Sequence, residues 1–495
     1  MPFGTPVVHP QRWRTAFGLV LVVGLVALSN PVVAAENAEG APTFNEDIAA
    51  ILYDNCASCH RAGQVAPMAL TSYRAARPWA RAIKAKVRAR EMPPWYADPR
   101  YGSFRNEMTL TPDEIDTLVA WADAGAPEGT GEAPELPKFS EGWTHPSGQD
   151  PDLVIRMPIE YAIPAEGESA NFNIYQKSPF DETVNIQAIQ ILPGNLRATH
   201  HSSFGARSLP EGTKLGRGPA FVGGPVIDNV PVSISEDEAF DNSGDRSEET
   251  AEESRARLER EVFAVQGTSL FVFYVPGGGF KQWPPGIGKR IVPDEYLYWG
   301  VHYNSTGVPE TDRHSAGLWL QKGEMTHEVL SRRVGQTHIA EGNELVAPNL
   351  EDGRVGRARI PVIPPGDADW AITGITAFQD DVTLYIAWPH MHLRGKDTTF
   401  VVTYPDGREE VVLDVPEYDF NWQLHYEFEE PLKLPAGSTI KTIGHFDNSI
   451  RNRYNPAPDR EVYWAEQSWD EMFNGRIDYS VDKLDLRLET PEIKE

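Results

Sequence analysis

From about residue 152 onward, the chain consists of short segments in which apolar and polar residues alternate, separated by turn residues. One series of these segments occupies residues 151–333 and a second occupies residues 338–490. Strands at this spacing without helical patterns between them are typical of antiparallel sandwiches or jelly rolls. The 41 Gly and 41 Pro residues agree with a chain of many turns. We therefore expect two antiparallel β-sandwich (jelly-roll) domains, one for each series.

Both cysteines of the chain lie in one segment, YDNCASCHRAG. Cys56, Cys59 and His60 match the C-x-x-C-H pattern of covalent c-type haem attachment. A redox C-x-x-C motif does not require the histidine, and a zinc site would need a second cysteine pair. The sequence therefore predicts one covalently attached haem with His60 as an axial ligand, and a fold without disulfide bonds.

The sixth ligand of a haem iron in such a site is commonly methionine. Met92 lies in REMPPWYADP, where two prolines would hold its loop rigid, and it is the predicted ligand. Met68, in VAPMAL, is the alternative, although it is close to the motif in sequence. A methionine in a core more often serves packing than coordination.

Residues 40–128, which surround the haem motif, contain three amphipathic stretches that predict helices. The last of them has a cap at Thr111 and a stop at Gly125. Residues 129–150 are rich in Pro, Glu and Gly and are interpreted as a linker. The expected fold class is therefore multidomain, with a small all-α cytochrome c domain followed by the two sandwiches.

The first 35 residues have the pattern of a secretory signal peptide, with two arginines before an apolar run and a small-residue cleavage site. An uncleaved membrane anchor is the alternative. We expect an exported protein, periplasmic or secreted, that is not attached to a membrane after cleavage. The net charge of −27 argues against a nucleic-acid partner. Residues 235–261 are acidic and predict a solvated loop, with a partner site as the alternative.

Five of the 13 histidines stand at positions that suggest a metal site. His200 and His201 are adjacent, so they can share a metal only at a bulge or a strand end. His302 lies in YWGVHYN, while His390 and His392 in WPHMHLRGKD are two apart and share one face of a strand. A single histidine is more often a hydrogen-bonded or exposed residue. Imidazoles also accept Zn, Cu, Fe or Ni, so the residue type does not name the metal.

The order HH, VHYN, HMH and WAEQSWDEMFNG resembles the copper type II, ascorbate-dependent monooxygenases, the family of peptidylglycine α-hydroxylating monooxygenase and dopamine β-monooxygenase. HFDNSIRNRYNP and WDEM resemble bacterial, cytochrome-fused members of this family. The resemblance covers about residues 150–490 and implies two copper ions. The implied first site is His200, His201 and His302, and the implied second, catalytic site is His390, His392 and Met472.

This chain differs from that family in two features and matches it in a third. The animal enzymes carry several disulfides, whereas both cysteines here are assigned to haem. Trp388 stands where the amidating enzymes place an arginine that reads a substrate carboxylate, which argues against a peptidyl-glycine substrate. Asn474, two residues after Met472, matches a substrate-contacting asparagine.

The resemblance implies hydroxylation of a C–H bond of a small organic substrate with O2. The electrons would come from an external donor, either an ascorbate-like reductant or a redox protein, and the haem is a candidate relay for them. Two other interpretations stay open, a non-catalytic copper and haem protein for electron transfer or metal binding, and a zinc hydrolase. The latter lacks the H-E-x-x-H pattern.

Overall fold

The computed structural model describes residues 40–64, 66–139, 142–167, 172–208, 232–233, 270–275, 278–335, 338–339, 342–346, 361–464 and 468–488. The predicted signal peptide and the predicted acidic loop at 235–261 lie outside these residues. Among the helices that are described, none is long and apolar enough to cross a membrane.

Short helices near the N-terminus share a small apolar core. They are η1 (Phe44–Ile48), α1 (Ala49–Asn55), α2 (Tyr73–Ala76), η2 (Arg77–Trp79), α3 (Ala80–Arg88) and α4 (Pro112–Asp123). At the start of α4 the Thr111 hydroxyl accepts a hydrogen bond from the Glu114 N–H, and the Glu114 carboxylate accepts one from the Thr111 N–H. This is the predicted cap, in the form of a capping box. Phe44 and Trp121 pack together in the core between these helices.

The first β half begins after residue 152 and contains three sheets. Its strands are β1 (Leu153–Arg156), β2 (Tyr161–Ile163), β3 (Phe172–Lys177), β4 (Val184–Leu192), β5 (Thr199–Arg207), β6 (Val232–Ser233), β7 (Leu270–Tyr274), β8 (Phe280–Gln282), β9 (Ile287–Ile291), β10 (Tyr296–Tyr303), β11 (Glu310–Asp312), β12 (Ser315–Leu320) and β13 (His327–Glu328). The sheet orders are β1-β12-β4-β9-β13 with β8 beside β4, β6-β3-β10-β5-β7, and β11-β2.

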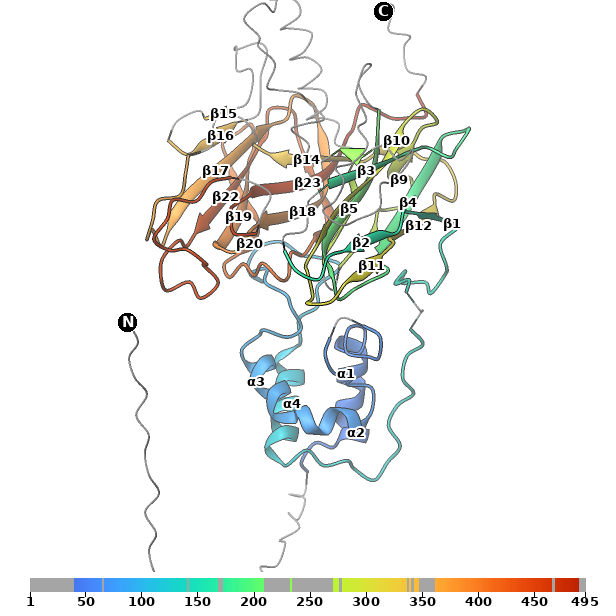
Figure 1. Ribbon diagram of the computed structural model, residues 1–495, viewed down its shortest axis with the longest axis vertical. Coiled ribbons are helices and arrows are strands. Elements are labelled where there is room, and N and C mark those ends of the chain that lie inside the picture. The colour runs from blue at the N-terminus through green and yellow to red at the C-terminus, as the bar shows by residue number, and fades with distance from the viewer. Residues whose placement is uncertain are drawn as a thin grey trace, which may run out of the picture.

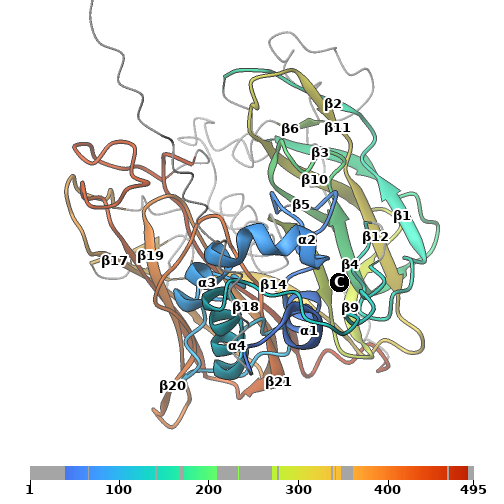
Figure 2. The ribbon, with the colours of Figure 1, turned by 90° about the horizontal axis from the view of Figure 1, so that it is seen from below.

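The second β half contains two sheets. Its strands are β14 (Leu330–Val334), β15 (His338–Ile339), β16 (Glu344–Val346), β17 (Trp370–Ala377), β18 (Val382–Met391), β19 (Gly395–Thr403), β20 (Glu409–Val415), β21 (Tyr426–Leu434), β22 (Thr439–Phe446) and β23 (Phe473–Val481). The sheet orders are β14-β23-β18-β21 and β15-β16-β17-β22-β19-β20. In Figure 1 the helices lie to one side of both halves, and Figure 2 shows them in front of the junction between the halves.

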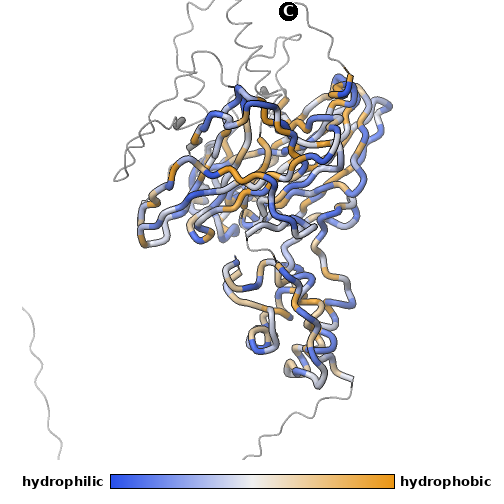
Figure 3. Tube along the Cα trace, turned by 90° about the vertical axis from the view of Figure 1, so that its right-hand side faces the viewer, coloured by the Kyte–Doolittle hydropathy of each residue, from blue (hydrophilic) through white to orange (hydrophobic). Residues whose placement is uncertain are grey.

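The strands follow the hydropathy pattern of the sequence. Strands β17, β19 and β22 alternate between buried and more exposed residues, and Figure 3 shows hydrophilic and hydrophobic residues interspersed along the tube. Strand β18 is different because all ten of its residues are buried. It pairs with β23 on one edge and with β21 on the other. Its last residues, His390 and Met391, pair with Asn474 and Phe473 of β23.

The predicted fold class is wrong in its first part, because the chain is mostly β-strand and no sizeable all-α cytochrome c domain is present among the described residues. The longest helix, α4, has 12 residues. Residues 95–107 were predicted inside the helical domain, yet they pack on the second β half. Trp95 lies with its ring 5.0 Å from that of Tyr426, and Phe104 forms a β-bridge with Phe428. The physical reason is that a small helical core does not cover these large rings, whereas the neighbouring sheet does.

The second part of that fold class, two separate antiparallel sandwiches, is also corrected. Strands β9 and β13 pair in parallel, as do β16 and β17. The two halves also share apolar core: Ile386 and Trp388 of β18 belong to the same buried cluster as Phe204 and Trp299 of the first half. The mostly β-sheet fold is compatible with a jelly-roll-like description.

Candidate metal centre

A β-bulge brings His200 and His201 to one side of the first β half. His302 on β10 pairs with His201 on β5, but the next residue, Tyr303, pairs with Thr199. His200 is therefore the extra residue of a bulge, which re-aims its side chain. The adjacent histidines thus lie at a bulge, which is one of the two settings in which they were expected to be able to share a metal, and the ligand nitrogens of the three histidines lie within 4.8 Å of one another.

The three imidazoles converge through their ring nitrogen atoms. His302 Nδ1 lies 3.1 Å from His201 Nε2 and 3.4 Å from His200 Nδ1. Burial lowers the pKa of His200 to about 3 and the pKa of His302 to about 4, and it also lowers the pKa of His201. The rings are therefore neutral at pH 7, which is the form that binds metals. Three converging neutral imidazoles fit a transition-metal ion.

The end of β18 presents a second set of donors. The rings of His390 and His392 have centroids 5.2 Å apart, and Met391 between them points into the opposite core. Met472 directly precedes β23, and its Sδ lies 3.3 Å from Nε2 of His390. The structure therefore brings together the three residues that the sequence predicted as the second site.

Hydrogen bonds indicate which ring nitrogen of each histidine carries the proton. Nδ1 of His390 faces Oε1 of the buried Gln423, and Nδ1 of His392 lies 3.3 Å from the carbonyl oxygen of Asp470. Both oxygens only accept, so each Nδ1 carries the proton and donates. Nε2 is then left as the lone-pair donor on each ring, which is the usual arrangement around a metal ion. Two imidazoles and a thioether suit copper, particularly Cu(I).

The two sets face each other across the junction of the β halves. The rings of His201 and His390 have centroids 6.4 Å apart. Phe420 contacts both sets, with its ring 5.1 Å from that of His200 and 5.9 Å from that of His392. The five histidines and Met472 therefore form one continuous centre and not two remote sites.

Two further predicted positions lie beside this centre. The amide nitrogen of Asn474 lies 3.8 Å from Met472 Sδ, and Asn474 pairs with His390 across β23 and β18. Its contact with a substrate stays a prediction. Trp388 is buried and its ring stacks on Phe273, with 5.4 Å between centroids.

The haem-attachment motif follows α1. Cys56 and Cys59 are free thiols, and the His60 N–H donates to the Cys56 carbonyl at 2.8 Å. Nδ1 of His60 lies 3.2 Å from the Met68 carbonyl oxygen, so Nδ1 donates and Nε2 is available as an iron ligand. Burial lowers the pKa of His60, which keeps the ring neutral. Two free thiols and a neutral histidine in this order fit covalent haem attachment.

The sixth haem ligand stays a prediction. The backbone of Met68 contacts His60, and its side chain packs against the helical core. Met92 is half-buried at the start of the segment that leads to Trp95 and the second β half.

Sequence reasoning missed three residues that shape the centre, namely Gln423, Phe420 and Glu471. Gln423 and Phe420 lie in FNWQLHY, a segment without a metal-binding signature. Glu471 directly precedes Met472, and that position in WDEMF was the available signal. Burial raises the pKa of Glu471 to about 8, while Arg394 and the backbone N–H groups that it binds act in the opposite direction.

Comparison with known proteins adds little. No family model matches the chain, and no curated protein matches it. The structure of PNGF-II in the P21 space group has a TM-score of 0.21 and 9% identity, covering 66% of this chain and 60% of that one. The VP2 subviral particle of infectious bursal disease virus has a TM-score of 0.16 and 9% identity, covering 67% of this chain and 72% of that one. Similarities at this level carry no argument about fold or function.

Proposed function

We propose that this chain is an exported, copper-dependent monooxygenase that hydroxylates a C–H bond of a small organic substrate with O2. The observation that carries the proposal is the convergence of three neutral imidazoles with a facing pair of imidazoles and a thioether. Bound copper ions would supply one-electron chemistry and the activation of O2.

In this proposal the side chains of the centre bind the two ions, pack between them and orient the substrate. His200, His201 and His302 hold one ion, while His390, His392 and Met472 hold the other. Phe420 lies against both sets and excludes water from the space between them. Asn474 is the candidate for orienting the substrate beside Met472.

The haem motif is the proposed entry point for electrons from an external donor, an ascorbate-like reductant or a redox protein. Tyr274 on β7 is buried in the first β half. The preceding residue, Phe273, contacts both His201 and His390. Substituting His60 should therefore slow turnover with a redox-protein donor more than turnover with ascorbate. Equal rates with both donors would reject the relay.

The test begins with copper content. We expect two copper ions per wild-type chain and one in His392→Ala and in Met472→Ala. The control is His445→Ala, because His445 pairs with Asp397 away from the centre. Oxygen consumption is then measured with ascorbate and a panel of small aliphatic and aromatic compounds. Stoichiometric zinc without copper would favour a hydrolase, and copper without substrate-dependent oxygen consumption would favour a non-catalytic redox protein.

A further inference from the structure

A buried carboxylate joins the two segments that carry the second set of donors. Glu471 has no solvent exposure. Its Oε2 accepts the N–H of His392 at 2.9 Å, and its Oε1 accepts the N–H of Arg394 at 2.7 Å. Both oxygens therefore accept backbone N–H groups, and these hydrogen bonds favour the carboxylate form against the burial that raises the pKa of this group.

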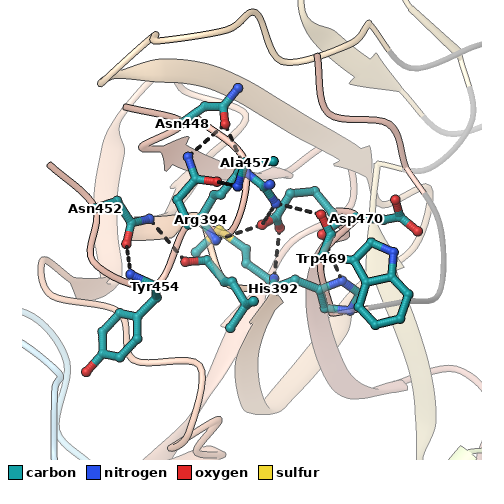
Figure 4. A network of polar contacts seen from close by, with 12 residues as sticks. His392, Arg394, Asn448, Asn452, Tyr454, Ala457, Trp469 and Asp470 are labelled. Carbon is teal, nitrogen blue, oxygen red and sulfur yellow. Dashed lines mark hydrogen bonds and ion pairs between the residues drawn. The ribbon is translucent and has the colours of Figure 1, made fainter. Parts of the chain in front are cut away.

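The side chain of Arg394 completes this arrangement from the other side. Its Nη1 donates to the Trp469 carbonyl at 2.7 Å and lies 3.9 Å from Glu471 Oε1. Its Nε donates to Oδ1 of the fully buried Asn448 at 3.0 Å. Figure 4 shows Arg394 in this network with His392, Asn448, Trp469 and Asp470.

Asn448 anchors the network to the rest of the second β half. Its amide donates to the carbonyl oxygens of Pro364 and Arg460 at 2.8 and 2.9 Å. The carbonyl of Arg394 in turn accepts the N–H of Asp447 at 2.8 Å. The turn after β18 is thus held on several sides, although it lies outside the strand ladder.

The residues before and after Glu471 in the chain both belong to the surroundings of the second donor set. Met472 is the next residue in the chain, and Asp470, whose carbonyl lies beside His392 Nδ1, is the previous one. The Glu471 carboxylate therefore sets the distance between a thioether donor on one segment and an imidazole donor on another. A pair of ligands from distant segments needs such support, because a loosely held ligand set loses metal affinity.

We infer that Glu471 is a positioning residue that keeps the donor atoms of His392 and Met472 at a fixed distance from each other, with Arg394 as its buried counter-ion. The inference rests on the proposed function, since it assumes that His390, His392 and Met472 form a metal site. Both oxygens of Glu471 bind backbone N–H groups of the turn, so we assign it to positioning and not to coordination.

The experiment uses the full chain, copper ions alone as the probe, and the variant Glu471→Gln. An amide keeps the shape of the side chain but replaces one acceptor with a donor, so only one of the two N–H groups is satisfied. The matched control is Glu427→Gln. Glu427 is also a buried carboxylate bound to an arginine, Arg105 at 2.7 Å, and it lies outside both donor sets.

Two measurements separate positioning from general stability, namely the apparent Kd of each copper and the sulfur contribution to X-ray absorption of the Cu(I)-loaded protein. In Glu471→Gln we expect the second copper to bind about 10- to 100-fold more weakly and the sulfur contribution to fall. The first copper should be unaffected, and Glu427→Gln should keep both coppers and the sulfur signal even if its Tm falls.

Unchanged affinity and an unchanged sulfur signal in Glu471→Gln would overturn the inference. If that variant does not fold, the variant Arg394→Lys tests the inference. Lysine keeps the charge but lacks the forked guanidinium that binds the Trp469 carbonyl and Asn448 Oδ1 together. It should weaken the second copper several-fold, and wild-type affinity would again overturn the inference. A wild-type chain that lacks a sulfur-ligated copper would instead reject the proposed function itself.

Discussion

His201 on β5 and His390 on β18 lie with their ring centroids 6.4 Å apart, and the ring of Phe273 contacts both. The two residues come from different β halves that share a buried core. The separation of the two donor sets is therefore fixed by packing. A large separation of the halves would expose Trp388 and Phe273, which stack together at the same junction.

The first prediction concerns magnetic interaction between the two proposed copper ions. Because the two donor sets face each other, two Cu(II) ions bound there should interact, and the electron paramagnetic resonance spectrum should be broadened. His302→Ala, which removes one donor set, should give the sharper spectrum of an isolated ion. A wild-type spectrum equal to the sum of two independent signals would contradict a shared centre.

The second prediction concerns Gln423, whose Oε1 accepts a hydrogen bond from His390 Nδ1. Replacing Gln423 with Leu removes the acceptor that fixes the ring orientation and its tautomer. We expect copper at the second set to bind about 10- to 100-fold more weakly, measured by competition with a chelator. Asn421→Ala is the control, because Asn421 bonds only locally to Asp419 in the same loop. Equal affinities in the two variants would argue against the role of Gln423.

The third prediction concerns a buried ion pair that crosses the junction of the β halves. Lys281 and Asp478 are both fully buried, with Nζ 2.7 Å from Oδ2. Asp478→Asn leaves the ammonium without its carboxylate, and the free energy of unfolding should fall by about 3–5 kcal/mol. Asp485→Asn, which breaks the surface pair with Arg487, should change stability little. Chemical denaturation of both variants tests this, and a similar loss in both would contradict it.

The fourth prediction concerns pH. Burial lowers the pKa of Lys289 from 10.5 to about 8 in the folded protein. Between these values the unfolded chain binds more protons than the folded one, so stability rises with pH. The unfolding free energy of the wild type relative to Lys289→Met should therefore increase by up to about 3 kcal/mol from pH 7 to pH 11. A difference that stays constant over this range would show that Lys289 does not titrate in this way.

Local patterns predicted much of the secondary structure and most donors of the candidate centre. The cap at Thr111, the strands of both halves and the shared face of His390 and His392 follow from spacing and periodicity alone. The partners of these donors could not be predicted, because Gln423 and Glu471 act through hydrogen bonds between segments far apart in the chain. The extent of the helical part was wrong for a related reason. Trp95 and Phe104 pack on a sheet formed by residues more than 300 positions later.

That docking of residues 95–107 means that the part of the chain with Cys56, Cys59 and His60 is not an interchangeable module. The chain leaves α3, crosses to β21 and returns to α4, and on the way the Arg105 guanidinium binds the buried Glu427. An excised N-terminal fragment would expose Trp95 and Phe104, and the remaining β halves would lose the partner of Glu427. Replacement of the helical part by one from another protein would thus have to bring the matching surface of β21 along with it.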